Sequence, residues 1–161
     1  MRIGLFLYRS VTWLFSPFIP LLMRYRVAQN KESAAAVQAR FAKNLAARPN
    51  GTLIWLHGAS VGESNLLLML ADALEEKRSD LKFLHTSQTL TSATLISSAI
   101  REKSNRLYYP APIDTPFIAS RFSQAWKPNL AIFAEGEIWP NLLDETRRSG
   151  AKTALINARM T

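Results

Sequence analysis

The pattern of hydrophobic and polar residues changes character after residues 48–51, "RPNG". From there on, short apolar runs alternate with longer segments in which apolar residues recur every three or four positions. The runs are typical of buried strands, and the longer segments of helices. Strands are predicted over 52–57, 82–87, 106–110, 130–135 and 152–157. Helices are predicted over 61–77, 91–103, 114–126 and 139–150, and Asp114 is expected to cap the third of them.

This alternation predicts an α/β domain over residues 51–161, with a Rossmann-like parallel sheet and helices on both faces. Such sheets bind ligands beyond the carboxyl ends of their strands, where polar residues of this sequence collect. Seven of these residues form the predicted substrate-binding set: Ser60, Gly62, Thr86, Ser87, Glu135, Asn157 and Arg159. Because such a domain normally continues with another helix, we expect the chain to be the front part of a longer protein.

The N-terminal part of the chain is organised differently. Residues 1–26 are strongly apolar, but Arg9 interrupts them and Pro17 and Pro20 would kink a helix there. The charge-free run 10–23 is shorter than the roughly 20 residues that a spanning helix needs. We therefore expect a membrane anchor that lies in or partly through one leaflet. A spanning signal-anchor and a helix buried against the domain are the alternatives.

Charge strengthens the membrane interpretation. Residues 1–50 contain eight Lys or Arg and one acid, whereas 51–161 contain twelve bases and eleven acids. The net charge of +8 thus belongs to the N-terminal segment and does not indicate a nucleic-acid surface. Arg24 and Arg26 favour a domain on the cytoplasmic side. The Ala-rich stretch 31–47 predicts a helix within a linker over 27–50.

The stretch "HGASVGES" at 57–64 fits two local templates. Gly-x-Ser-x-Gly would make Ser60 the nucleophile of a serine hydrolase, but the histidine and acid of a triad do not follow in a suitable order. Ser-x-x-Glu is a capping box, in which Ser60 begins a helix and Glu63 lies three residues later. At the mouth of the sheet, Glu63 is also a candidate general base. The sequence lacks a phosphate-binding P-loop and the dinucleotide fingerprint.

Two further carboxylates, Glu135 and Glu137, follow the fourth predicted strand in "AEGEIWPNLL". Two glutamates without an Asp/His cluster are weak grounds for a metal site, and we expect none. The same carboxylates could simply complement the N-terminus of the next helix. The absence of cysteine excludes disulfides and thiol catalysis.

Several of these stretches occur together in one family. "IWLHGASVGES", "HTSQTLTSAT", "YPAPIDTP", "KPNLAIFAEGEIWPNLL" and "TALINARMT" resemble, in order and spacing, the 3-deoxy-D-manno-octulosonic acid (Kdo) transferases, and the N-terminal "LYRSV" fits as well. The resemblance implies the N-terminal, acceptor-binding half of a GT-B glycosyltransferase, with the C-terminal donor domain absent. It further implies transfer of Kdo from CMP-Kdo to a hydroxyl of the lipid A precursor, at the cytoplasmic face of the inner membrane.

The resemblance also assigns roles to two residues. Glu63 matches the family's catalytic base, and Glu137 matches a second family carboxylate that would stabilise the cation-like transition state or orient the acceptor. The resemblance implies that the anomeric centre is inverted and that no cofactor besides the donor is needed. Because the C-terminal donor domain is absent, we expect this chain alone to be inactive. A serine hydrolase using Ser60 and a non-catalytic, membrane-anchored lipid-binding module remain the alternatives.

Overall fold

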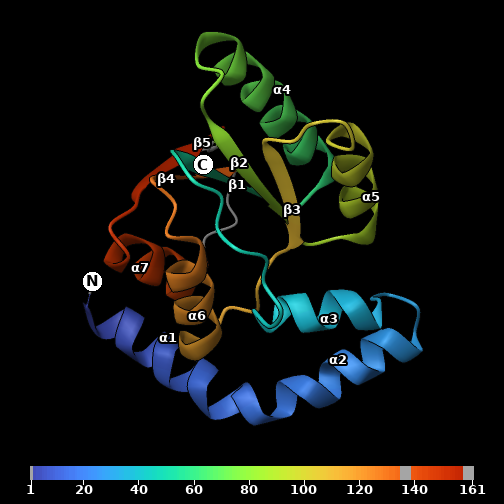
Figure 1. Cartoon of the computed structure of the whole chain (residues 1–161). Coiled ribbons are helices and arrows are strands. Elements are labelled where there is room, and N and C mark those ends of the chain that lie inside the picture. The colour runs from blue at the N-terminus through green and yellow to red at the C-terminus, as the bar shows by residue number, and fades with distance from the viewer. Residues whose placement is uncertain (1, 135–138, 158–161) are drawn as a thin grey trace.

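The computed structural model of the chain describes residues 2–134 and 139–157 (Figure 1). These residues contain a five-stranded parallel sheet in the order β3-β2-β1-β4-β5. The strands are β1 (Leu53–Gly58), β2 (Lys82–Ser87), β3 (Arg106–Pro110), β4 (Leu130–Ala134) and β5 (Lys152–Ile156). The parallel sheet predicted from the sequence is therefore confirmed, and its order is that of a doubly wound fold.

Two pairs of helices cover the two faces of this sheet (Figure 1). The helices are α4 (Val61–Lys77), α5 (Leu90–Ala99), α6 (Pro116–Trp126) and α7 (Pro140–Arg148). Successive side chains of a strand point to opposite faces, and β1 divides in this way. Its Ile54 and Leu56 pack against α4, whereas Leu53 and Trp55 pack in the cluster that contains α6 residues. Both halves of the core thus meet on β1.

Two predicted helices end earlier than expected. The helix predicted over 31–47 is α3 (Ala34–Arg40), because the chain leaves the helix at Phe41 and Ala42 takes φ 51°, in the left-handed region. This turn buries Ala42 in the core, so tertiary packing overrides the local preference of an Ala-rich segment. Likewise, α5 stops at Ala99 and is followed by Ile100, which packs in a small apolar cluster with α4.

The helix caps follow the sequence with one correction. Asp114 was expected to cap the helix that follows it, but Thr115 does so, accepting a hydrogen bond from the Ile118 amide. Asp114 instead caps α7, where its carboxylate accepts hydrogen bonds from the amides of Asn141 (3.3 Å) and Leu142 (2.7 Å). The reason is that α7 has no side-chain cap of its own, and its orphan N–H groups need an acceptor.

The N-terminal segment forms α1 (Arg2–Phe15), a 3-10 turn η1 (Ser16–Phe18) and α2 (Ile19–Ala28). The interruption at η1 contains Pro17, as the sequence predicted. The two helices run along one side of the domain, below α6 and α3 in Figure 1. Residues 3–28 are long and apolar enough to cross a membrane, and none of the 18-residue apolar window that defines this candidate span is buried.

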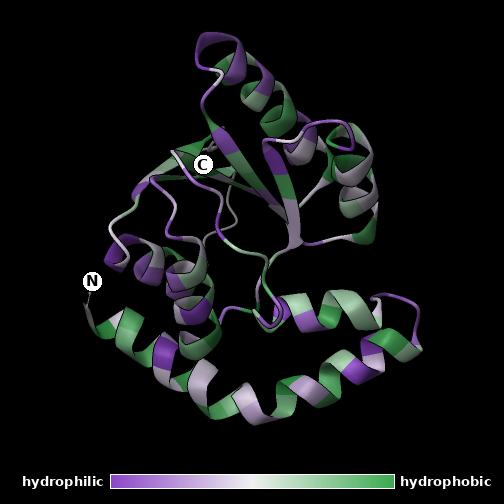
Figure 2. Cartoon of the chain, in the orientation of Figure 1, coloured by the Kyte–Doolittle hydropathy of each residue, from purple (hydrophilic) through white to green (hydrophobic). Residues whose placement is uncertain are grey.

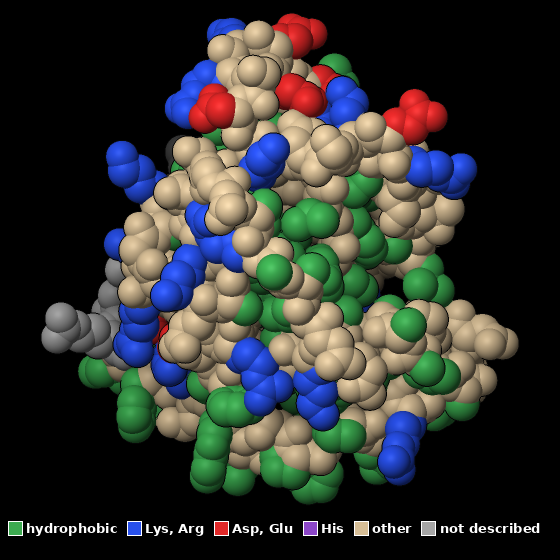
Figure 3. All heavy atoms as spheres, in the orientation of Figure 1, with side chains coloured by type: hydrophobic (Ala, Val, Ile, Leu, Met, Phe, Trp, Pro, Cys, Tyr) green, Lys and Arg blue, Asp and Glu red, His purple; other side chains and the backbone are tan. Residues whose placement is uncertain are grey.

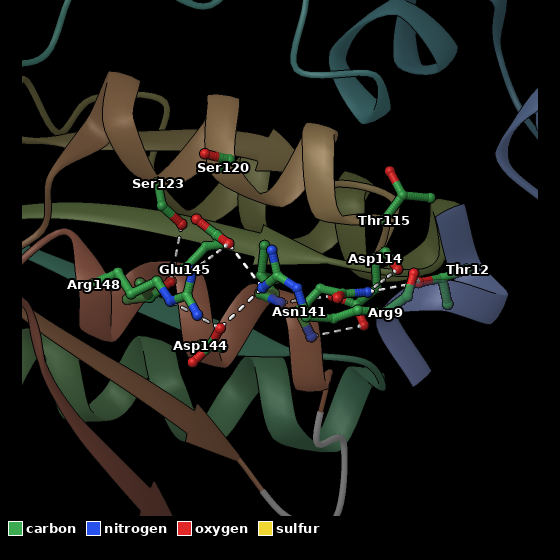
Figure 4. Close-up of polar contacts among 12 residues, drawn as sticks. Arg9, Thr12, Asp114, Thr115, Ser120, Ser123, Asn141, Asp144, Glu145 and Arg148 are labelled. Atoms are coloured by element: carbon green, nitrogen blue, oxygen red, sulfur yellow. Dashed lines mark hydrogen bonds and ion pairs between the residues drawn. The ribbon is translucent and has the colours of Figure 1, made fainter. Parts of the chain in front are cut away.

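A row of polar side chains attaches α1 to the domain (Figure 4). Arg9 forms ion pairs with Asp144 (2.9 Å) and Glu145 (2.8 Å) of α7. One turn away, the Thr12 hydroxyl accepts a hydrogen bond from Asn141. The Tyr8 hydroxyl donates to Asp114 at 2.8 Å, and burial is the main reason that the pKa values of both Tyr8 and Asp114 are raised. Polar contacts, rather than an apolar interface, thus hold α1 in place.

Candidate active site

The strand order reverses between β1 and β4. These strands are neighbours, yet the chain leaves β1 for α4 on one face, and α7, the helix after β4, lies on the other. The carboxyl edge at such a reversal is the usual ligand site of a doubly wound sheet. The loop after β1 leads to Glu63, while residues 135–138, next in the chain after β4, lie outside the described residues.

Glu63 is largely buried at the N-terminus of α4 and has partners for both carboxylate oxygens. Its Oε2 accepts a hydrogen bond from the Ala59 amide at 2.6 Å, and its Oε1 accepts one from the Ser60 hydroxyl at 2.8 Å. Ser60 Oγ in turn accepts a hydrogen bond from the Glu63 amide at 3.2 Å. The predicted capping box is confirmed, with the difference that Glu63 reaches the amide one residue before the cap.

This arrangement holds the Glu63 carboxylate in one orientation and leaves part of its hydrogen-bonding capacity unused. An ionised carboxylate has about four lone-pair sites, of which these bonds use two. A ligand hydroxyl at the mouth of the sheet can therefore add a further hydrogen bond. The exposed Ser60 is the neighbouring polar group that such a ligand would meet.

The two glycines of this loop have different roles. A Cβ on Gly58 would lie 2.9 Å from Glu63 Cβ and 3.1 Å from Leu67 Cδ1, so this glycine lets α4 pack closely on the end of β1. Gly58 thus has a packing role and does not clear space for a ligand. A Cβ on Gly62 would meet only Ser60 Oγ, at 4.0 Å, so the space beside Gly62 is open.

Thr86 and Ser87 lie at the carboxyl end of β2 as predicted, but the protein encloses both side chains. Thr86 Oγ1 accepts a hydrogen bond from Trp55 Nε1 at 2.8 Å and lies 2.9 Å from His57 Nδ1. Ser87 Oγ lies 3.2 Å from the Tyr108 hydroxyl. Their existing partners supply a structural role, and contact with a substrate stays a prediction for both.

Both histidines are buried rather than placed beside Ser60. Burial lowers the pKa of His57 to about 4, and burial, with Arg106 nearby, lowers the pKa of His85 to about 4. Among the described residues, the hydroxyl of Ser60 pairs with Glu63 and with neither histidine. The geometry thus gives Ser60 a capping role and places neither histidine beside it, so the Ser-His pair of a serine hydrolase is not formed.

The remaining predicted residues are only partly described. Glu135, Glu137 and Arg159 lie outside the described residues, so their predicted roles stay predictions. Asn157 is exposed directly after β5 and takes φ 53°. Within residues 2–134 and 139–157, no group of three His, Asp or Glu side chains is arranged to hold a metal ion.

Sequence reasoning missed a buried polar centre around Arg40. Its guanidinium bonds Glu32 (2.7 Å), the side chain and carbonyl of Gln88 (3.1 and 2.6 Å) and the carbonyl of Ala111 (3.0 Å). It thereby joins α3 to the segments that follow β2 and β3. The sequence did contain a signal of this centre, because Glu32 and Arg40 are oppositely charged residues within the Ala-rich segment 31–47.

The fold and this site define the chain as a Rossmann-like α/β domain that presents a carboxylate at its ligand-binding edge and carries an apolar N-terminal helix pair. Comparison with known proteins is more specific. The family described as "3-Deoxy-D-manno-octulosonic-acid transferase (kdotransferase)" matches residues 8–161. The chain belongs to this family, as its motifs suggested.

Relatives bear the same name. A "Probable 3-deoxy-D-manno-octulosonic acid transferase, mitochondrial" of Arabidopsis thaliana is 36% identical over 164 residues, covering 100% of this chain and 36% of the relative. The "3-deoxy-D-manno-octulosonic acid transferase" of Rickettsia bellii is 34% identical over 155 residues, covering 96% of this chain and 36% of the relative. The chain thus spans about a third of the length of these relatives.

Proposed function

We propose that this chain is the acceptor-binding domain of a glycosyltransferase that moves Kdo from CMP-Kdo to a hydroxyl of the lipid A precursor. Membership of the Kdo transferase family supports the sugar that is transferred. The observation that carries the proposal is the buried, oriented carboxylate of Glu63 at the carboxyl edge of the sheet. The donor site would lie in a second domain of a GT-B enzyme, so this chain alone would be inactive.

In the proposed step, Glu63 acts as the general base. The acceptor hydroxyl oxygen forms a bond to the anomeric carbon of Kdo while the bond from that carbon to the phosphate oxygen of CMP breaks. The hydroxyl proton passes to the Glu63 carboxylate, and CMP leaves with the bonding electron pair. A single displacement of this kind inverts the anomeric centre, and one positioned base is sufficient for it. Such a base contributes typically about 10²- to 10⁴-fold to the rate.

Glu137 would act in the same step on the donor side. The anomeric carbon becomes cation-like in the transition state, and a fixed carboxylate stabilises developing positive charge. In the chain, Glu137 follows β4, the strand that neighbours β1, whose end leads to Glu63. The phosphate of CMP is a good leaving group, so the proposed step includes no cofactor.

The N-terminal helices would hold this domain on the cytoplasmic face of the inner membrane. Apolar side chains of α1 and α2 point away from the domain, and Figure 3 shows hydrophobic side chains along the edge where these helices lie. Figure 2 shows hydrophobic residues recurring along both helices. In α1 they gather on one face, as in amphipathic helices that lie in a membrane interface. Since Arg9 and Tyr8 are bonded to the domain, we favour this in-plane anchor over a spanning one.

The decisive experiment replaces Glu63 by Gln in the enzyme that carries this domain together with its donor domain. We expect Kdo transfer to fall by at least about 100-fold, because the amide cannot accept the proton. Ser60→Ala is the control: it removes the cap hydroxyl but leaves the base, so transfer should fall far less. An unchanged rate of Kdo transfer in Glu63→Gln would contradict the assignment of Glu63 as the general base. Labelling of Ser60 by a fluorophosphonate probe would favour the hydrolase instead, and precursor binding without any transfer would favour a non-catalytic lipid-binding module.

A further inference from the structure

A cleft lies between helix α2 and the carboxyl edge of the sheet. Its volume is about 350 Å³, within the range of about 300–1,000 Å³ that is usual for small-molecule sites. One wall is α2, with Leu22, Met23 and Arg26. The opposite wall consists of residues that follow β2 and β3, together with Trp139 before α7. Among the described residues, none of those proposed above as catalytic or substrate-binding lines this cleft.

Two side chains of the cleft wall have unused hydrogen-bonding capacity. Glu32 is 5% exposed, and its Oε1 has no hydrogen-bond partner among the residues that the structure describes. Within the same part of the chain, Trp139 Nε1 is also buried and without a partner. Leaving a buried polar group unpaired costs about 1–3 kcal/mol, and more if it is charged. An acceptor and a donor in one cleft wall therefore favour a ligand that supplies both.

The surrounding contacts hold the polar side chains of this cleft in defined positions. Arg40, 6% exposed, fixes Glu32 through its Nε at 2.7 Å and ties it to Gln88. Arg26 lies 3.9 Å from the same carboxylate and is partly exposed at the rim. The cleft thus combines a held carboxylate, an accessible guanidinium and an indole ring.

Hydroxyl groups match this combination, because each one donates and accepts a hydrogen bond. A sugar ring carries several of them, and a phosphate on the sugar would pair with Arg26. We propose that this cleft binds the phosphorylated sugar headgroup of a membrane glycolipid. Glu32 would accept a bond from one hydroxyl, and Trp139 would donate to another. Both atoms are enclosed in the unliganded protein, so binding requires a side-chain shift in the cleft wall.

The position of the cleft explains why its ligand would be attached to a lipid. Leu22 of α2 lines it and is 54% exposed, so one residue contributes both to the cleft wall and to the apolar outer surface. A headgroup in the cleft could keep its acyl chains beside α2, in the bilayer. In the sheet, Gly58 pairs with Ser87, so the cleft residue Gln88 follows a strand next to the one that leads to Glu63. The inference rests on the proposed function, to which it adds the headgroup-binding residues.

The test compares binding of the 161-residue chain to vesicles of phosphatidylethanolamine and phosphatidylglycerol, with and without lipid A precursor. We expect the precursor to strengthen binding. Trp139→Phe and Glu32→Gln should each reduce this gain by about tenfold, while binding to the plain vesicles stays unchanged. Trp126→Phe is the matched control, because it removes another buried, unpartnered indole N–H at a site outside the cleft. A second arm uses the deacylated sugar phosphate in solution to separate headgroup recognition from membrane attachment.

The outcomes are distinct. If the precursor gives no gain, or if both cleft variants keep the full gain while remaining folded by circular dichroism, the inference is overturned. The inference is supported if Trp139→Phe and Glu32→Gln weaken binding both to the precursor in vesicles and to the deacylated sugar phosphate in solution. In the enzyme with its donor domain, the same variants should raise KM for the precursor and leave KM for CMP-Kdo unchanged. A wild-type enzyme that binds the headgroup in the cleft but transfers no Kdo would contradict the proposed function and leave this inference standing.

Discussion

Glu63 illustrates how one side chain can serve the fold and remain available for chemistry. Its carboxylate accepts hydrogen bonds from the Ala59 amide and the Ser60 hydroxyl, which begin α4. The same bonds fix the carboxylate at the mouth of the sheet, where the proposed general base would act. A helix cap and a catalytic base are therefore compatible roles, because orientation by the cap lowers the cost of placing the base.

A second residue-scale consequence concerns pH. His57 is fully enclosed, and burial lowers its pKa from 6.5 to about 4. The unfolded chain therefore binds a proton between these values that the folded chain does not, so stability falls as pH drops from 6.5 toward 4. In His57→Gln this loss should shrink by up to about 1.4 kcal/mol per pH unit in that window. Urea unfolding from pH 7 to 4.5 measures it, and equal pH dependence of variant and wild type would contradict the prediction.

At the scale of elements, close packing determines how α4 sits on β1. A Cβ on Gly58 would clash with Glu63 and Leu67, both on α4, so a larger residue must displace the helix that carries Glu63. On the other face, Asp114 joins α1, α6 and α7 through Tyr8 and the amides of Asn141 and Leu142. The helices on both faces of the sheet are therefore held by a few specific contacts.

Gly58→Ala should destabilise the chain by about 1–3 kcal/mol, as overpacking of a core typically does. Gly62→Ala is the matched control, since its added methyl meets nothing closer than 4.0 Å and alanine favours the helix. Thermal and urea unfolding of both variants check the prediction. Equal stability of the two would show that α4 adjusts without cost.

At the scale of the whole molecule, exposed apolar side chains gather at one pole. In Figure 3, acidic side chains lie at the end of the molecule where α4 lies, interspersed with Lys and Arg, while hydrophobic side chains line the opposite edge, where α1 and α2 lie. The apolar pole contains Phe6, Trp13 and Leu21, each more than half exposed. This separation orients the proposed membrane contact and keeps the acidic side chains of α4 away from an anionic bilayer.

Replacing Phe6 or Trp13 by Ser should therefore weaken binding to anionic vesicles. These side chains are 68% and 67% exposed, and burial of one large apolar side chain in lipid contributes about 1.5–3 kcal/mol, which corresponds to tenfold or more in affinity. Met69→Ser is the control, because Met69 is 70% exposed on α4 at the opposite pole. Vesicle co-sedimentation provides the measurement. If Met69→Ser lost as much binding as Trp13→Ser, the assigned membrane face would be wrong.

The sequence by itself determined the order of strands and helices, the capping box of Ser60 and Glu63, and the family, because these depend on local periodicity and on motifs. It could not predict that Asp114 caps α7 rather than its own helix, or that Gly58 is required by packing. It also gave no cleft between α2 and the sheet edge, since Glu32, Arg40 and Trp139 are far apart in the chain. Only the tertiary structure decides such features, because the partners of a buried polar group are chosen by proximity in space and not by spacing in sequence.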